Sequence, residues 1–94
     1  MNSVDSIYAD EVKLQLRQLA NYGGSGQRPI DLSLPSNRFT VWYMNGCQGY
    51  LCIGSGADRA AALKVVGQYE MDEAFIFEAL ECRDKVTYVS CSTS

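Results

Sequence analysis

The sequence contains no histidine among its 94 residues. Because histidine is the usual base that activates a serine or cysteine nucleophile, its absence excludes Ser–His and Cys–His catalytic pairs. A nucleophile would have to be activated by a lysine or by a terminal amine instead. The composition is otherwise ordinary for a globular protein, since 47% hydrophobic and 20% charged residues exclude extensive disorder. We expect residues 1–94 to form a single domain with one core.

Long apolar runs and basic clusters are also lacking. No stretch approaches the roughly 18 apolar residues of a membrane span, and residues 1–5 have neither the cationic nor the apolar part of a signal peptide. The eight lysines and arginines are scattered, and eleven acids give a net charge of −3. Nothing resembles the basic stripe that neutralises phosphates in nucleic-acid-binding proteins. We therefore expect a cytoplasmic protein with no nucleic-acid and no membrane partner.

Four cysteines, Cys47, Cys52, Cys82 and Cys91, raise the question of a metal site or a disulfide. The C-x4-C and C-x8-C spacings differ from those of zinc sites, and Cys47 and Cys52 would point to opposite faces of one strand. Thiols stay reduced in a cytoplasm. We favour buried, reduced cysteines with no metal and no cofactor over the two alternatives, disulfides and zinc.

Hydrophobic periodicity predicts an α+β fold with about three helices. Residues 5–20 carry an apolar helical stripe made of Tyr8, Val12, Leu16 and Leu19, with Ile7 and Leu14 on the other side. Residues 57–66 predict a short helix of small residues that ends at Gly67. Residues 72–82 predict a third, with glutamates facing solvent and Phe77 among them. The segment 21–37, rich in glycine at its start, predicts a long connection that could hold a short edge strand; a substrate lid is the alternative.

The clearest local pattern is a β-hairpin over residues 39–53. β-Branched and aromatic residues precede Asn45-Gly46, a pair that suits the two positive-φ positions of a type I′ turn. This turn would place Trp42 opposite Gly49. One face would then hold Phe39, Val41, Tyr50 and Cys52, and the other Trp42, Met44, Leu51 and Ile53. Since both faces are apolar, the hairpin belongs inside a layered structure or at an interface, and a strand over residues 86–91 completes a small antiparallel sheet.

The segment Gly54-Ser55-Gly56 follows this hairpin and precedes a predicted helix. Glycines before a helix N-terminus can cradle a phosphate, so these three are candidate binding residues. The dinucleotide motif fails because Arg59 stands at its third glycine, and Asp58 puts negative charge where a phosphate would lie. A tight strand-to-helix turn, with Gly54 or Gly56 at positive φ, is the alternative that we favour.

Residues 50–91 resemble the C-terminal half of a proteasome β-subunit, a pattern shared by the bacterial proteasome-like proteases. The resemblance comprises the strand at 50–53, the G-S-G turn, the alanine-rich helix from Ala60, a second helix around Glu78-Ala-Leu and the strand at 86–89. It implies half of a layered fold in which two sheets are flanked by helices, with Ser55 near an N-terminal threonine nucleophile. This chain starts Met-Asn and lacks the family's N-terminal half, so the resemblance implies a truncated, non-catalytic relative.

Three functional hypotheses follow. The first is a non-catalytic binding or assembly module that forms a homodimer or higher homo-oligomer, with Ile7, Leu14, Trp42 and Phe77 at the interface. The second is a small inhibitor or adaptor, of the kind that mobile elements and phages encode, whose acidic helix at 70–84 docks on a basic protein surface. The third is a small hydrolase, for which we identify no catalytic residue.

Overall fold

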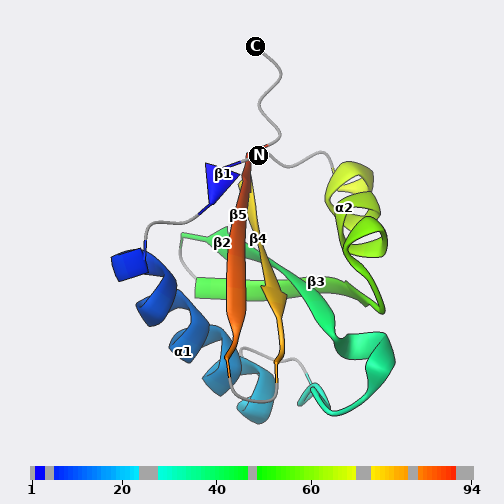
Figure 1. Cartoon of the computed structure of the whole chain (residues 1–94), viewed down its shortest axis with the longest axis horizontal. Helices are drawn as coiled ribbons and strands as arrows, with labels where there is room; N and C mark the ends of the chain where they lie inside the picture. The colour runs from blue at the N-terminus through cyan, green and yellow to red at the C-terminus, as the bar shows by residue number, and fades with distance from the viewer. Residues whose placement is uncertain are drawn as a thin grey trace.

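The computed structural model describes residues 2–3, 6–23, 28–46, 49–69, 73–80 and 83–90 (Figure 1). The elements are, in chain order, β1 (Asn2–Ser3), α1 (Ser6–Tyr22), the 3₁₀ turn η1 (Pro35–Asn37), β2 (Phe39–Asn45), β3 (Gly49–Gly56), α2 (Arg59–Gln68), β4 (Glu73–Glu78) and β5 (Lys85–Ser90). The α+β class, the hairpin and the C-terminal strand are confirmed. The described part of the chain has two α-helices rather than three. Neither is long and apolar enough to cross a membrane.

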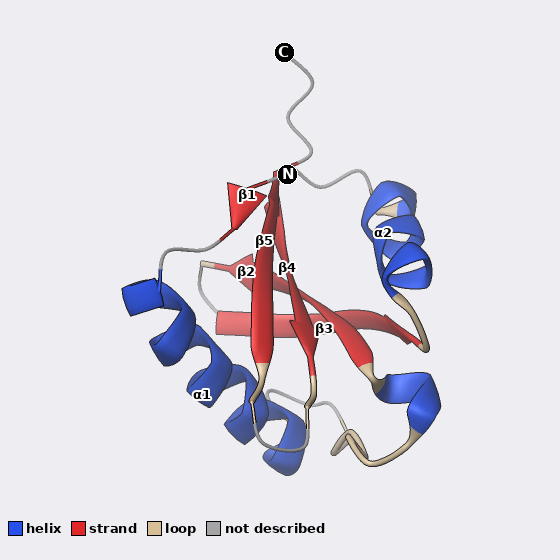
Figure 2. Cartoon of the chain, viewed as in Figure 1, coloured by secondary structure: helices blue, strands red, loops and turns tan. Residues whose placement is uncertain are grey.

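The strands form one antiparallel sheet in the order β1-β5-β4-β2-β3. The two helices cover opposite faces of this sheet (Figure 2). On one face, Val12, Leu16 and Ala20 of α1 pack against a cluster that includes Trp42, Tyr50, Phe77 and Val86. On the other, Ala62 and Val66 of α2 pack against Val41, Ala74, Ile76 and Val89. The hydrophobic core is therefore divided between two layers, because the central strands are apolar on both faces.

A buried polar group joins β2 to β4 inside the first of these layers. The Trp42 indole Nε1 donates a hydrogen bond of 2.7 Å to Thr40 Oγ1, and Thr40 Oγ1 donates one of 3.4 Å to the Phe77 carbonyl. The indole N–H is thus paired although Trp42 is 0% exposed. Burial of tryptophan without such a partner would cost free energy of folding.

The predicted third helix is wrong, because residues 73–78 form strand β4. The apolar run from Ala74 to Phe77 fits a strand that is buried on both faces, and a run this short does not distinguish a strand from a helix. Phe77 is 0% exposed and contributes to the α1 layer, so its predicted place among solvent-facing glutamates is wrong. Glu78 forms an ion pair of 3.0 Å with Arg38. Asp72, where the predicted helix begins, and the thiol Cys82 lie outside the described residues.

The hairpin forms where expected, but its predicted register is wrong. Asn45 pairs with Gly49, so the loop contains three residues instead of two, and Trp42 lies opposite Cys52 rather than Gly49. A shift of odd size exchanges the two faces of a strand. Tyr50 and Cys52 consequently share the α1 layer with Trp42, whereas we expected them beside Phe39 and Val41.

A β-bulge then changes the register again. Trp42 pairs with Cys52 but Val41 pairs with Gly54, which leaves Ile53 as an extra residue on β3. Ile53 packs in the α2 layer, with Val41, and not with Trp42 as predicted. The bulge turns Gly54 towards α2, since directly opposed residues lie on the same face of a sheet.

The connection at residues 28–37 contains the turn η1 and no strand. Its backbone is fastened to α1 by a hydrogen bond of 2.8 Å from Ile30 N to the Ala20 carbonyl. Ile30 and Leu32 pack against the α1-side core. Their alternation, which suggested an edge strand, therefore marks two side chains that anchor an irregular segment beside α1.

Candidate functional site

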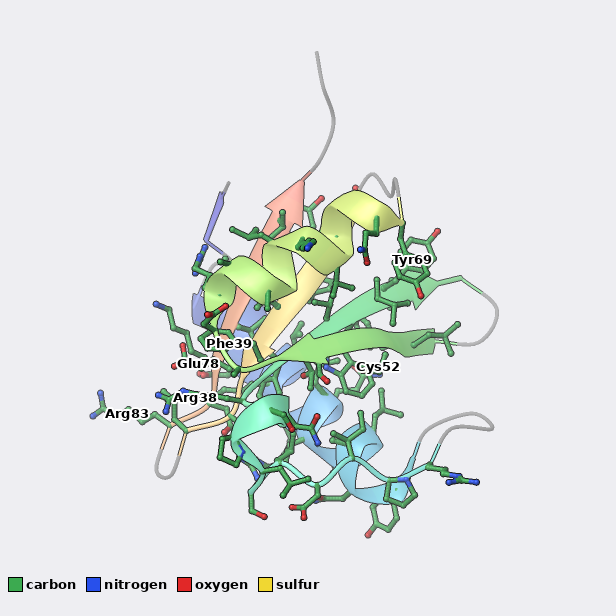
Figure 3. All side chains as sticks on the ribbon, turned by 90° about the vertical axis from the view of Figure 1, so that its right-hand side faces the viewer. Arg38, Phe39, Cys52, Tyr69, Glu78 and Arg83 are labelled. Atoms are coloured by element: carbon green, nitrogen blue, oxygen red, sulfur yellow. The ribbon has the colours of Figure 1, made fainter. Side chains whose placement is uncertain are left out.

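A groove with a volume of about 560 Å³ runs between the 28–37 segment and β3. Its lining residues are Arg28, Pro29, Ile30, Asp31, Leu34, Asn37, Cys52, Ile53, Gly54 and Ser55. Figure 3 views the molecule towards this side, with α2 above β3 and the segment that carries η1 below it. The groove combines an apolar wall with a few polar groups, which is typical of ligand and peptide sites.

Side-chain hydrogen bonds of Asp31 and Asn37 shape the outer wall. Asp31 Oδ1 accepts hydrogen bonds from Ser33 Oγ at 2.5 Å and from Ser33 N at 3.0 Å, the pattern of an Asx turn. These bonds hold the pKa of Asp31 below its usual range. Asn37 Nδ2 donates a hydrogen bond of 3.1 Å to the Asp31 carbonyl. The wall is therefore built from local hydrogen bonds and carries an ionised carboxylate at neutral pH.

The inner wall is β3, which contributes one hydroxyl and one thiol. Ser55 Oγ donates a hydrogen bond of 3.0 Å to Asn37 Oδ1 and so connects the two walls. Cys52 Sγ lies 3.5 Å from the Gly54 carbonyl, to which it donates. Burial raises the pKa of the Cys52 thiol, which is therefore protonated at neutral pH.

This arrangement suits binding better than nucleophilic catalysis. The Ser55 hydroxyl donates to an amide oxygen, which is not a base, and the protonated Cys52 thiol is a poor nucleophile. What the groove offers is apolar contact, hydrogen-bonding groups, and two charges of opposite sign at Arg28 and Asp31. Such a surface can hold a polypeptide segment.

The predicted candidates Gly54, Ser55 and Gly56 do not form a turn before a helix. They are the last three residues of β3, and the described glycines with positive φ are Gly23 and Gly49. The predicted positive φ at Gly54 or Gly56 is therefore wrong. The helix N-terminus is occupied by the chain itself, because Asp58 caps α2 by accepting a hydrogen bond of 2.8 Å from Ala61 N.

Close packing of α2 explains the two glycines instead. A Cβ at Gly54 would lie 2.7 Å from Val65 Cγ1, and a Cβ at Gly56 would lie 2.5 Å from Ala61 Cβ. Both separations are far below van der Waals contact. Gly54 and Ser55 do line the groove, but as parts of a strand. Gly67 does not end α2 as predicted, since the helix continues to Gln68.

The predicted interface residues are not brought together. Trp42 and Phe77 are both 0% exposed, so the prediction that they form a surface patch is wrong. Leu14 is 62% exposed on α1, as expected of a surface residue, whereas the side chain of Ile7 lies outside the described part of the chain. We predicted that both aromatic side chains are exposed because we expected fewer strands than the sheet contains.

The thiols show no metal-binding arrangement in the part of the chain that the structure describes. Cys47, Cys82 and Cys91 lie outside that part, and the described residues contain no group of three potential metal ligands.

Comparison with known proteins adds no relative. No protein-family model matches the sequence, and no curated protein or solved structure is significantly similar to it. The resemblance to proteasome β-subunits included two successive helices after the G-S-G segment, whereas here α2 is followed by strand β4.

Proposed function

We propose that this protein is a non-catalytic assembly module that self-associates through β3 and the groove beside it. The observation that carries the proposal is that β3 lies at the edge of the sheet. Among the described residues it pairs with β2 alone, so its outer row of backbone N–H and C=O groups faces away from the sheet. An edge of this kind is a template for another strand.

The composition of β3 strengthens the argument. Soluble proteins usually protect an edge strand with lysine, with proline or with a very short length. β3 is eight residues long and contains neither a charged residue nor a proline. Its bulge at Ile53 leaves residues 49–52 as a regular stretch. We infer that this stretch pairs with its counterpart in a second copy.

A second copy fits this surface because a twofold interface must complement itself. Antiparallel pairing of two β3 strands meets that requirement through the backbone alone. The groove adds Arg28 and Asp31, whose opposite charges lie on one rim, so that each can meet its opposite in the other copy. Leu34, 47% exposed in the same groove, supplies apolar surface that a partner would cover.

Two matched substitutions test the proposal. Leu51 on β3 and Tyr43 on β2 are direct cross-strand partners, so they lie on the same face, one at the sheet edge and one a strand further in. Leu51→Lys should abolish the dimer, because a lysine on an edge strand opposes pairing with another chain. Tyr43→Lys places the same charge on β2, one strand away from the β3 edge, and should leave the dimer intact.

Light scattering and sedimentation measure the outcome directly. The wild-type protein at tens of micromolar should have twice the 10.4 kDa mass of one chain, and Leu51→Lys should have the mass of one. A folded wild-type protein with the mass of a single chain would contradict the proposal. So would equal loss of association in both variants, because it would point to the shared face rather than to the edge.

The proposal includes a relationship to proteasome-like hydrolases as a shortened, non-catalytic form. Its support is the order of a hydrophobic strand, Gly54-Ser55-Gly56 and an alanine-rich helix. For the hydrolase hypothesis, the test is Ser55→Ala against a panel of esterase and peptidase substrates. Loss of a measured activity in that folded variant would favour an enzyme.

A further inference from the structure

A second cleft lies where β2 and β4 diverge, and it shares no lining residue with the groove. The two strands are paired only as far as Trp42 and Phe75. Beyond that point β2 continues with β3, and β4 continues with β5. Figure 1 shows the two strands crossing and separating towards this end. The resulting cleft has a volume of about 250 Å³ and is lined by Tyr43, Met44, Glu73 and Phe75.

Neighbouring aromatic rings position the lining side chains. The Phe75 ring lies edge-on to both Tyr50 and Tyr88, with centroid distances of 5.5 Å in each case. Desolvation raises the pKa of Tyr88, and a hydrogen bond to the Glu73 carboxylate and the charge of that carboxylate raise it further. The carboxylate is thus held beside the aromatic surface, while the Met44 side chain is 46% exposed.

Among the described residues, no lysine or arginine forms an ion pair with Glu73. The ion pairs among the described residues join Lys13 to Asp10, Arg17 to Asp84 and Arg38 to Glu78. Glu73 takes part in none of them. A carboxylate next to an aromatic ring and a thioether, in a chain of net charge −3, is complementary to an organic cation that also carries apolar groups.

We propose that this cleft binds the lysine or arginine side chain of a partner polypeptide. The methylene groups of such a side chain would pack against Met44 and Phe75, and its charged end would lie at Glu73. This site is independent of the β3 edge, and it gives the adaptor hypothesis a structural basis. That hypothesis placed the contact on an acidic helix, whereas the cleft is formed by two strands.

An NMR titration with blocked amino acids tests the proposal. The probes are N-acetyl-lysine methylamide and N-acetyl-arginine methylamide, with N-acetyl-norleucine methylamide as the uncharged control of similar shape. The cationic probes should shift the Met44 methyl and Glu73 amide signals, with dissociation constants in the millimolar range. Norleucine should bind about fivefold more weakly or not at all.

The matched variants are Glu73→Gln and Glu11→Gln. Each raises the net charge by one, but only the first removes the carboxylate from the cleft; Glu11 is exposed on α1. Glu73→Gln should weaken lysine binding about fivefold, and Glu11→Gln should leave it unchanged. Equal effects of the two variants would overturn the proposal, as would equal binding of lysine and norleucine. Tetramethylammonium should bind more weakly than lysine, since it lacks the methylene chain; binding as tight as that of lysine would refute an extended side chain as the ligand.

Discussion

Replacing Gly56 with alanine should destabilise the fold by pushing α2 away from the sheet. An added Cβ would lie 2.5 Å from Ala61 Cβ, about 1 Å closer than normal carbon–carbon contact. A Cβ has no rotamer through which to escape, so the helix or the strand must shift. At Gly54 the obstacle is the Val65 side chain, at 2.7 Å, whose χ1 is restricted in a helix.

The magnitude follows from two opposing terms. Overpacking a close contact costs about 1–3 kcal/mol of unfolding free energy. Replacing a glycine in a strand with alanine raises the free energy of unfolding by about 0.5–1 kcal/mol where the backbone conformation suits alanine. Gly56 meets this condition because its φ is not positive. With the middle of both ranges, the net loss for Gly56→Ala should be about 1.25 kcal/mol, and Gly56→Val should lose more. Gly67→Ala is the control: it lies in α2 with open space around its Cβ and should gain about 0.5–1 kcal/mol.

Urea unfolding followed by the fluorescence of Trp42, the one tryptophan and fully buried, measures these differences. A double-mutant cycle with Ala61→Gly adds a sharper criterion. Ala61→Gly alone should cost about 1 kcal/mol of helix propensity, but combined with Gly56→Ala it removes the clashing Cβ. The pair should therefore lose less than the sum of the single losses. Strictly additive effects, or a Gly56→Ala variant as stable as the wild type, would refute the packing explanation.

Two further predictions concern buried groups. Phe77→Ala should lower the free energy of unfolding by about 3–5 kcal/mol in a denaturant titration, whereas Leu14→Ala should change it by less than about 0.5 kcal/mol, because Phe77 is in the core and Leu14 is on the surface. Similar small effects of both would restore the interface prediction for Phe77. For Cys52, the folded pKa lies above the ordinary value of 9.0, so the unfolded chain loses its proton first and the free energy of unfolding should fall as pH rises above that value. Denaturation at about pH 8 and about pH 10 should show a smaller fall in Cys52→Ala than in the wild type, and an equal fall would contradict the assignment to this thiol.

The sequence was sufficient to predict α1 and the strands that have alternating or aromatic-rich patterns. The stripe of Val12 and Leu16 predicts α1, and the residues around Trp42 predict β2. In each segment the buried residues recur at the spacing of that type of secondary structure. The stretch at residues 73–78 was misassigned because a strand covered by helices on both faces loses its alternation. Without alternation, its glutamates and its four apolar residues matched a helix equally well.

The register of the β2–β3 hairpin could not be predicted from the sequence, for a different reason. Asn45-Gly46 fits a two-residue turn, but the pair that closes the loop is Asn45 with Gly49, and Gly49 adopts positive φ. The signal for this alternative was Gly49 itself, since a longer hairpin loop often ends on a glycine in that conformation. The groove was not predicted because the 28–37 segment lacks the hydrophobic periodicity of a helix or strand. Its two prolines and the apolar residues Ile30 and Leu32, which anchor it, could have indicated an ordered segment.

The bulge at Ile53 couples the groove to the docking of α2. In the register of Trp42 with Cys52, residue 54 would lie on the same face as Cys52, and Ser55 would face α2. The extra residue reverses this order, so that Gly54 and Gly56 meet α2 while Cys52 and Ser55 line the groove. One irregular residue therefore lets a single strand present glycines to a close helix and polar groups to a binding surface. A change that removed the bulge would alter both surfaces together, which distinguishes this strand from one whose two faces could vary independently.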